Sequence, residues 1–265
     1  MSAEMSLESA SGAVSGGEAS PPFPSGLDPA AARRQAALLL VLFYGIVYGS
    51  PLLLDGAPHR GITPMLSAFV VGTAMLLAML LYIRRDASWQ ESLALRSQPF
   101  GRTVSWSLLG FLGIYAVNLV LTLTYVAARG DVQAVAAQRL GWLGILADLP
   151  IGTILPLALF AGFWEETVFR GFFLGRLRAA IPAAQERGAR LRRDALATLL
   201  TALFFGLGHG YQGPLGVLQT TLAGVTMGAL VLWRQSLWPA IGAHLTVDLF
   251  GLLAIQALKT FLKAP

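Results

Sequence analysis

The chain contains no cysteine among its 265 residues, and only 12% of its residues are charged. The lack of cysteine excludes disulfide bonds, thiolate catalysis and cysteine-ligated zinc sites. The scarcity of charge accompanies a hydrophobic content of 55% and a mean hydropathy of +0.64, values outside the range of ordinary soluble domains. The sequence therefore predicts a protein that folds in a membrane rather than in water alone.

Long uncharged stretches of the chain reach the length of about 20 apolar residues that a helix needs to cross a bilayer. They cover residues 35–54, 61–83 and 103–128. Three further apolar regions, at 140–174, 195–233 and 235–258, carry only a few ionisable residues. Unpaired backbone groups are costly in lipid, and the stretches lack the alternation of barrel strands. We therefore predict an all-α fold, a polytopic transmembrane bundle of about six to eight helices.

The first 30 residues differ from the rest, because they are rich in Ser, Gly, Ala and Pro and lack an apolar face. We interpret residues 1–30 as a disordered tail and residues 31–265 as the transmembrane domain. No cleavable signal peptide is visible, since the first apolar stretch starts only after Gln35 and runs too long for one.

Basic residues gather in alternate predicted loops, including a run of arginines between residues 176 and 193 and the pair Arg33 and Arg34. The positive-inside rule then predicts a multi-pass protein of the cell (inner) membrane with a cytoplasmic N-terminus. The net charge of +5 does not indicate nucleic-acid binding, because the basic residues form no patch interleaved with aromatics.

Two adjacent carboxylates and an arginine interrupt the apolar stretch Phe-Trp-Glu-Glu-Thr-Val-Phe-Arg-Gly, at Glu165, Glu166 and Arg170. Ionisable residues at membrane depth are costly and usually functional. Glu166 and Arg170 share a helix face and can pair, while Glu165 points about 100° away. The motif indicates either a free carboxylate at Glu165 or a purely structural ion pair with a second glutamate near the interface.

Two histidines also lie in predicted spans. His209 follows Phe205 by four residues, and His244 precedes Asp248 by four, so that each pair shares a helix face. Taken alone, each fits a hydrogen-bonded packing residue or a self-contained buried pair. Three separate structural accidents are less expected than one site, so we predict that Glu165 and both imidazoles surround a hydrated pocket within the bilayer.

In this order, the three motifs resemble the CPBP family, the CAAX protease and bacteriocin-processing group of intramembrane proteases. The family pattern is Glu-Glu-x-x-x-Arg, then Phe-x-x-x-His, then His-x-x-x-Asn or Asp, and the match covers about residues 160–250. The resemblance implies an intramembrane endopeptidase. Glu165 would act as general base on a water held with His209, while His244 and Asp248 form or support the oxyanion site.

The resemblance also implies supporting roles for Glu166, Arg170 and Phe205. Family members with asparagine at position 248 have a neutral amide donor, whereas an ionised Asp248 cannot donate a hydrogen bond. Asp248 would then either be protonated or fix the tautomer of His244, and we favour the second.

No cofactor is expected, and zinc is the alternative. Members of the family have been described both as metalloproteases and as glutamate-dependent enzymes, and the ligands here would be Glu165, His209 and His244. The zinc motif His-Glu-x-x-His is absent. We favour the glutamate mechanism, because pairing of Glu166 with Arg170 leaves one carboxylate for the water.

The expected partners are the lipid bilayer and a peptide or protein substrate cut close to the membrane. The resemblance allows prenylated CAAX tails, bacteriocin leader peptides or C-terminal membrane tails. The Ala- and Arg-rich composition is typical of a bacterium with a GC-rich genome, where prenylation is unexpected, which favours an unmodified tail.

Two other functions compete with proteolysis. The first is a non-catalytic bacteriocin-immunity or membrane scaffold protein of the same fold, which needs only a polar cavity. The second is a proton-coupled transporter with Glu165, His209 and Asp248 as a relay, which is weaker because no internal repeat is visible.

Overall fold

The computed structural model describes residues 27–53, 63–86, 88–130, 149–182 and 186–263. Most of these residues are helical, and none of them lies in a strand. The predicted all-α bundle is therefore confirmed. Residues 1–26 of the predicted tail lie outside the described residues.

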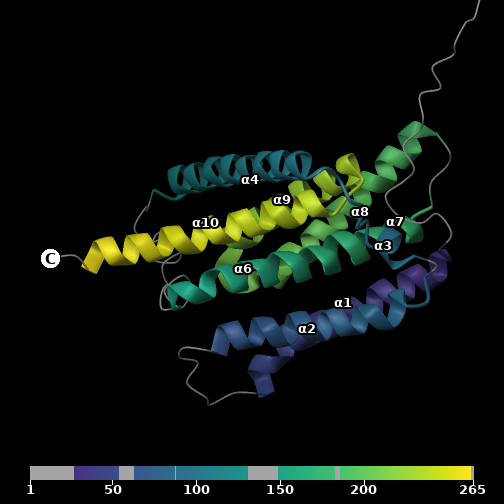
Figure 1. The fold of residues 1–265 in the computed structure, drawn as a ribbon, viewed down its shortest axis with the longest axis horizontal. Helices are drawn as coiled ribbons and strands as arrows, with labels where there is room; N and C mark the ends of the chain where they lie inside the picture. Colours follow the sequence, from purple (N-terminus) through teal and green to yellow (C-terminus); the bar gives the residue numbers. More distant parts are fainter. Residues whose placement is uncertain (1–26, 54–62, 87, 131–148, 183–185, 264–265) are drawn as a thin grey trace, which may run out of the picture.

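The helices follow one another as α1 (Pro29–Leu53), α2 (Thr63–Ile83), α3 (Trp89–Ser92), α4 (Phe100–Arg129), α6 (Ile151–Glu166), the π-helix η1 (Thr167–Phe173), α7 (Leu174–Ala180), α8 (Arg187–Gly208), the 3₁₀ turn η2 (Gly210–Gln212), α9 (Gly213–Arg234) and α10 (Trp238–Lys263). Figure 1 shows them packed as a bundle. Helix α10 packs against both α4 and α6, α8 packs against α9, and the pair α1 and α2 lies against α7 and α6.

Five helical stretches in the described part of the chain are long and apolar enough to cross a membrane. They are Pro29–Tyr48, Phe100–Arg129, Ile151–Ala180, Gly210–Arg234 and Trp238–Ala257. A shorter apolar helix covers Phe69–Ile83. These stretches fit a multi-pass membrane protein.

The arginine-rich segments gather at one end of the bundle. At the right of Figure 1 lie the start of α1, the end of α2, the start of α4, all of α7 and the start of α8. The end of α4, the start of α6 and the end of α10 lie at the opposite end. The arginines of these segments thus lie toward one end of the bundle, as their alternation along the chain predicts.

Two arginines that the sequence assigned to a loop are instead helical and buried in α7. Arg176 donates to Gln35 of α1 at 2.7 Å and to Asp86, just after α2, at 2.8 Å. Arg178 pairs with Asp194 of α8 at 2.8 Å. These contacts tie α1, α2 and α8 to α7, so these two arginines hold helices together.

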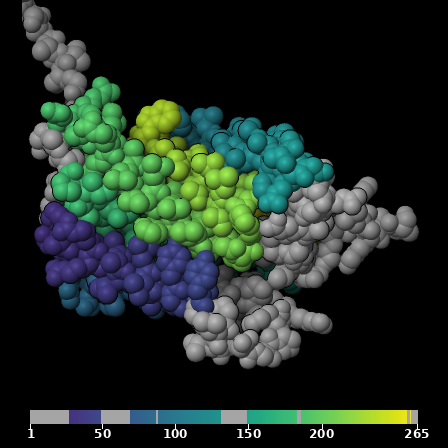
Figure 2. Space-filling view, turned by 180° about the vertical axis from the view of Figure 1, so that it is seen from behind, coloured from purple at the N-terminus to yellow at the C-terminus, as the bar shows by residue number. Residues whose placement is uncertain are grey.

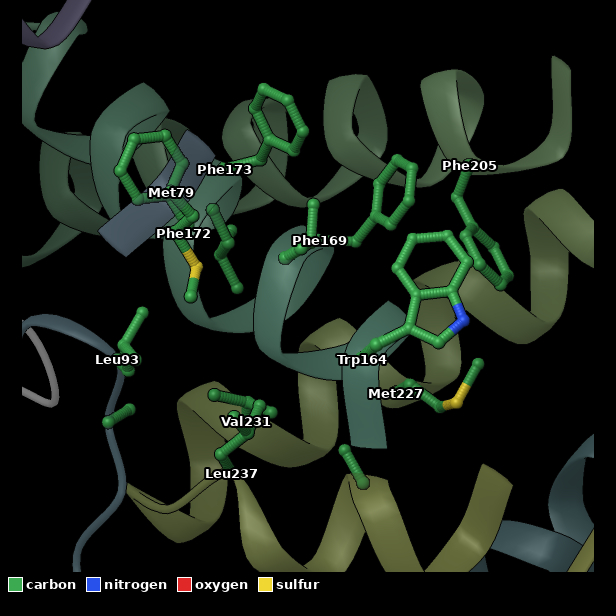
Figure 3. Close-up of a cluster of buried hydrophobic side chains, with 14 of the residues drawn as sticks. Met79, Leu93, Trp164, Phe169, Phe172, Phe173, Phe205, Met227, Val231 and Leu237 are labelled. Atoms are coloured by element: carbon green, nitrogen blue, oxygen red, sulfur yellow. The ribbon is translucent and has the colours of Figure 1, made fainter. Parts of the chain in front are cut away.

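Aromatic residues form the core around η1. Trp164, Phe169, Phe172 and Phe173 come from α6 and η1, and Phe205 reaches them from α8 (Figure 3). The ring of Phe169 lies 5.1 Å from that of Phe205 and 5.5 Å from that of Phe173, measured between centroids. Tilted and edge-on pairs of this kind add about 0.5 to 1.5 kcal/mol each beyond their buried area. The segment that carries the acidic motif is therefore held in a well-packed part of the bundle.

Glycines let α8 and α9 come into close contact, as small residues do between membrane helices. A Cβ atom on Gly206 would lie 2.8 Å from the carbonyl oxygen of Val217, and one on Gly228 would lie 2.8 Å from Cγ2 of Thr198. The end of α8, which leads into His209, is thus seated directly on α9.

We predict that Gly206→Ala lowers the free energy of unfolding by about 1 to 3 kcal/mol, because the added methyl group overpacks the contact with α9. The control is Gly45→Ala on α1, where an added Cβ meets nothing within 4 Å. Alanine is the better helix former, so this change should be neutral or slightly stabilising. Thermal unfolding in detergent measures both, and equal shifts in Tm would contradict the close contact.

Candidate active site

The acidic motif lies where α6 changes into the π-helix η1. Glu165 and Glu166 are the last two residues of α6, and Arg170 lies in η1. Arg170 Nη1 donates to Glu166 Oε1 at 2.8 Å, with both side chains buried. The pair expected from the four-residue spacing forms, although the backbone after Glu166 is π-helical rather than α-helical. Such π segments frequently occur at functional sites.

The same carboxylate oxygen also holds a histidine of another helix. Nδ1 of His244 on α10 lies 2.8 Å from Glu166 Oε1. Asp248, the residue that we expected to orient His244, is farther away, with Oδ2 3.5 Å from Nε2. The closer partner of His244 is therefore Glu166. No local pattern predicts this contact, because the two residues are 78 positions apart.

His209 follows the last residue of α8, and its ring is held by the backbone. Its Nδ1 lies 2.9 Å from the carbonyl oxygen of Phe205. A carbonyl oxygen only accepts hydrogen bonds, so Nδ1 must carry a proton and donate it. In the neutral ring, Nε2 is then an acceptor, and this atom is on the side of Glu165.

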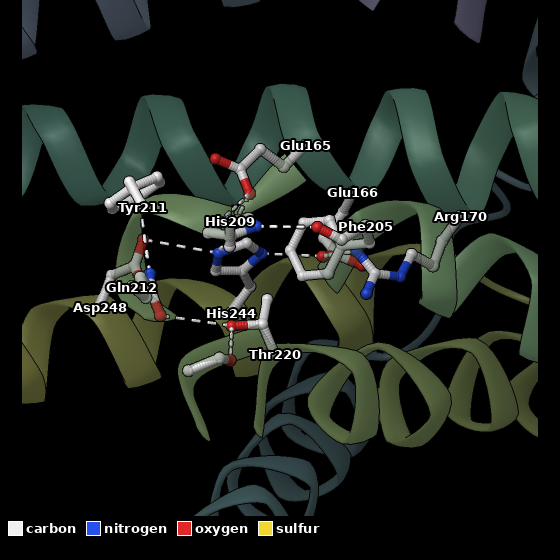
Figure 4. Close-up of polar contacts among 11 residues, drawn as sticks. Glu165, Glu166, Arg170, Phe205, His209, Tyr211, Gln212, Thr220, His244 and Asp248 are labelled. Carbon is white, nitrogen blue, oxygen red and sulfur yellow. Dashed lines mark hydrogen bonds and ion pairs between the residues drawn. The ribbon is translucent and has the colours of Figure 1, made fainter. Parts of the chain in front are cut away.

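One carboxylate oxygen of Glu165 lies close to both imidazoles. Its Oε2 lies 3.9 Å from Nε2 of His209 and 3.9 Å from Nε2 of His244. The atom is buried and makes no hydrogen bond to the described residues. The separation is too long for a direct hydrogen bond and suits one bridging water molecule. Figure 4 shows the carboxylate pointing from α6 toward the two rings, so the three side chains predicted to share a site do lie together.

Phe205 lies between the ion pair and the imidazoles. The guanidinium of Arg170 is 4.0 Å from the centroid of the Phe205 ring, and the rings of His209 and His244 are 4.7 Å and 6.0 Å from it. A cation over an aromatic face is attracted by the ring quadrupole. Phe205 therefore packs against both the ion pair and the two imidazoles.

Exposure rises across the site in one direction. The exposed fraction of the side chain is 0% for Glu166, 8% for His244, 14% for Glu165, 18% for His209 and 30% for Asp248. The site therefore has a deep end at the ion pair and an open end, which is its more exposed part, at Asp248.

Two residues of η2 border the open end and were not singled out from the sequence. The ring of Tyr211 lies 5.8 Å from that of His209, and Gln212 Nε2 donates to the Tyr211 hydroxyl at 3.2 Å. Thr220 of α9 donates to Gln212 Oε1 at 3.4 Å (Figure 4). Their only sequence signal is their position directly after His209.

Among the described residues, no group of three His, Cys, Asp or Glu side chains is placed so that it could hold a metal ion. Nδ1 of His209 and Nδ1 of His244 are engaged by a carbonyl and a carboxylate, which leaves only the two Nε2 atoms facing Glu165. These two Nε2 atoms and Glu165 Oε2 are the donors of the zinc ligand set considered from the sequence, and histidines that bind metals usually donate their other ring nitrogen in this way.

The helical bundle and this centre of carboxylates and imidazoles define a polytopic membrane protein with a site suited to water activation. Residues 147–250 match the family model described as Type II CAAX prenyl endopeptidase Rce1-like. The matched segment carries all three motifs and is similar to the CAAX protease family that they predicted. The match supports an intramembrane endopeptidase function. No curated protein and no solved structure matches the chain.

We predict that Arg170→Ala destabilises the fold by about 3 to 5 kcal/mol, because it leaves the buried Glu166 carboxylate without its cation. The matched control is Arg84→Ala, at an exposed position at the end of α2. Chemical denaturation of both variants in detergent measures the effect. A similar, small change in both would show that Glu166 does not depend on Arg170.

Proposed function

We propose that the protein is an intramembrane endopeptidase that hydrolyses a peptide bond close to the membrane in a peptide or protein tail. One observation carries this proposal: the buried Oε2 of Glu165 lies 3.9 Å from Nε2 of both His209 and His244. A water molecule between these atoms would have a base on one side and space for a scissile carbonyl on the other.

Glu165 and His209 activate the water. Because Nδ1 of His209 donates to the Phe205 carbonyl, Nε2 can accept one hydrogen of the water, while Glu165 accepts the other. As the water oxygen bonds to the carbonyl carbon, its proton moves to Glu165. When the carbon–nitrogen bond breaks, Glu165 returns that proton to the leaving amine, and the products are an amine and a carboxylic acid, which then releases its proton to water.

His244 stabilises the oxyanion. With Nδ1–H donated to Glu166, its Nε2 can donate only when the ring is positively charged, which suits a developing negative charge. One well-placed donor contributes about 3 to 4 kcal/mol to such a transition state. Asp248, 3.5 Å from the same Nε2, supports His244 from the open end. This role replaces the one expected from the sequence, in which Asp248 fixes the tautomer.

Glu166, Arg170 and Phe205 hold these groups in place without contacting the substrate. Their burial at the deep end and their contacts with His244 and His209 support this division. We further propose that the arginine-rich end of the bundle, with the N-terminus, faces the cytoplasm.

Glu165→Gln should abolish cleavage, with kcat lowered by about 10² to 10⁴, because glutamine cannot accept the proton. The matched control is Glu91→Gln, at an exposed position on α3. Proteomes of cells carrying each variant are compared for membrane-proximal tails that accumulate uncut. Accumulation with Glu165→Gln alone supports a protease. Unchanged processing, with both variants folded, would instead favour a non-catalytic immunity or scaffold protein.

The glutamate mechanism predicts that a strong metal chelator leaves the rate of tail cleavage unchanged, and that added zinc does not raise it. The substrate is the tail identified by the proteome comparison, incubated with the purified full chain. Loss of activity on chelation, with recovery on adding zinc, would replace this mechanism by a metal-dependent one.

A further inference from the structure

The end of α8 has backbone carbonyls without helical partners, and it packs against α1 and α9. The last four carbonyls of any α-helix lack such partners, and leaving them unpaired away from water is costly. In α8, the Phe205 carbonyl accepts from His209 Nδ1 and the Gly206 carbonyl accepts from His209 N, both at 2.9 Å. The ring and the backbone amide of His209 therefore cap the C-terminus of α8.

Two tyrosines of α1 add hydrogen bonds to this end of the helix from outside it. The hydroxyl of Tyr44 donates to the Phe204 carbonyl at 2.5 Å, and the hydroxyl of Tyr48 donates to the Leu207 carbonyl. Tyr44 and Tyr48 are one helical turn apart, and their rings stack with centroids 5.8 Å apart. We call these two residues the α1 clamp.

Close packing surrounds the α1 clamp. A Cβ atom on Gly208 would lie 2.8 Å from the ring of Phe43, and one on Gly210 would lie 2.8 Å from the Tyr48 hydroxyl. The residues on either side of His209 therefore have no room for a side chain on the α1 side. Figure 2 shows α1, in purple and blue, lying along the green surface of α8.

We propose that the α1 clamp positions the His209 ring for catalysis. The two hydroxyls hold the carbonyls of Phe204 and Leu207. Between these two lies the carbonyl of Phe205, which accepts the hydrogen bond that orients the His209 ring. Tyr44 and Tyr48 are therefore positioning residues that act through His209 and do not contact the substrate. Both lie outside residues 147–250, the segment matched by the family model. The inference rests on the proposed function, since it assigns His209 a role in holding the water.

Kinetics of hydroxyl-deletion variants provide the first test. In the full chain, the double variant Tyr44→Phe/Tyr48→Phe should lower kcat by about 10- to 100-fold, because a small misplacement of a catalytic group has that effect. KM should change by less than about twofold, since the substrate contacts remain. The substrate is the tail that accumulates with Glu165→Gln. The matched control is Tyr125→Phe on α4, whose ring packs against the Arg129 guanidinium at 5.3 Å.

Nuclear magnetic resonance provides a test that does not require activity. The chain has three histidines, so ¹⁵N-histidine labelling yields few ring signals, and the His209→Gln spectrum assigns those of His209. In the double variant, the His209 ring signals should shift or broaden while those of His244 stay in place and the Tm stays near the wild-type value. A general loss of structure would move both sets of signals together.

The outcomes separate the two proposals. If the His209 ring signals of the double variant match those of the wild type, the α1 clamp does not position His209, whatever the cleavage rate. If the His209 signals shift but cleavage is as fast as in the wild type, the α1 clamp positions the ring without contributing to catalysis. If Glu165→Gln still cuts, the proposed function fails, while the resonance result still decides whether the α1 clamp positions His209. Should the double variant not fold, Tyr48→Phe alone, which removes only an exposed hydroxyl, is measured in the same way.

Discussion

The site depends on one buried oxygen atom, Oε1 of Glu166. A carboxylate far from water is stable only when it is paired and hydrogen-bonded. Arg170 supplies the charge from η1, and His244 supplies a second hydrogen bond from α10. Because the two donors belong to different helices, the oxygen joins the π-helical segment to α10. The positions of His244 and, through packing, Phe205 follow from that junction.

The two adjacent carboxylates have different surroundings: Glu166 is paired with Arg170, and Glu165 lies beside the imidazoles. Neighbouring residues on a helix point about 100° apart, so Glu166 can face the ion pair while Glu165 faces the imidazoles. Exposure follows the same division, since the deep end is closed around Glu166 and the open end leads past Asp248. The ion pair of Glu166 with Arg170 is therefore shielded from solvent, while Asp248 is the most exposed of the site's acidic side chains.

Local features of the sequence predicted much of this structure. Uncharged stretches of sufficient length gave the all-α bundle, and four-residue spacing gave the pair of Glu166 with Arg170. The contact of Glu166 with His244 could not be predicted in this way, because it depends on how α6 and η1 meet α10.

Other features depend equally on packing. The π-helical backbone of η1 and the burial of Arg176 have no periodic signal, and the tyrosines of α1 look like ordinary residues of an apolar span. Each acquires its role only from a distant partner: Arg176 from Asp86, and Tyr44 and Tyr48 from the end of α8. The motifs thus indicated which residues lie together, while tertiary contacts determine which atom each one meets.

The central claim is that one water molecule lies between Glu165 and the two imidazoles. A high-resolution experimental density map of the wild-type protein in lipid tests it most directly. The account predicts a single solvent oxygen within about 3 Å of both Glu165 Oε2 and His209 Nε2. A carboxylate of Glu165 turned away from the histidines, or a metal ion bound in the water's place, would contradict it.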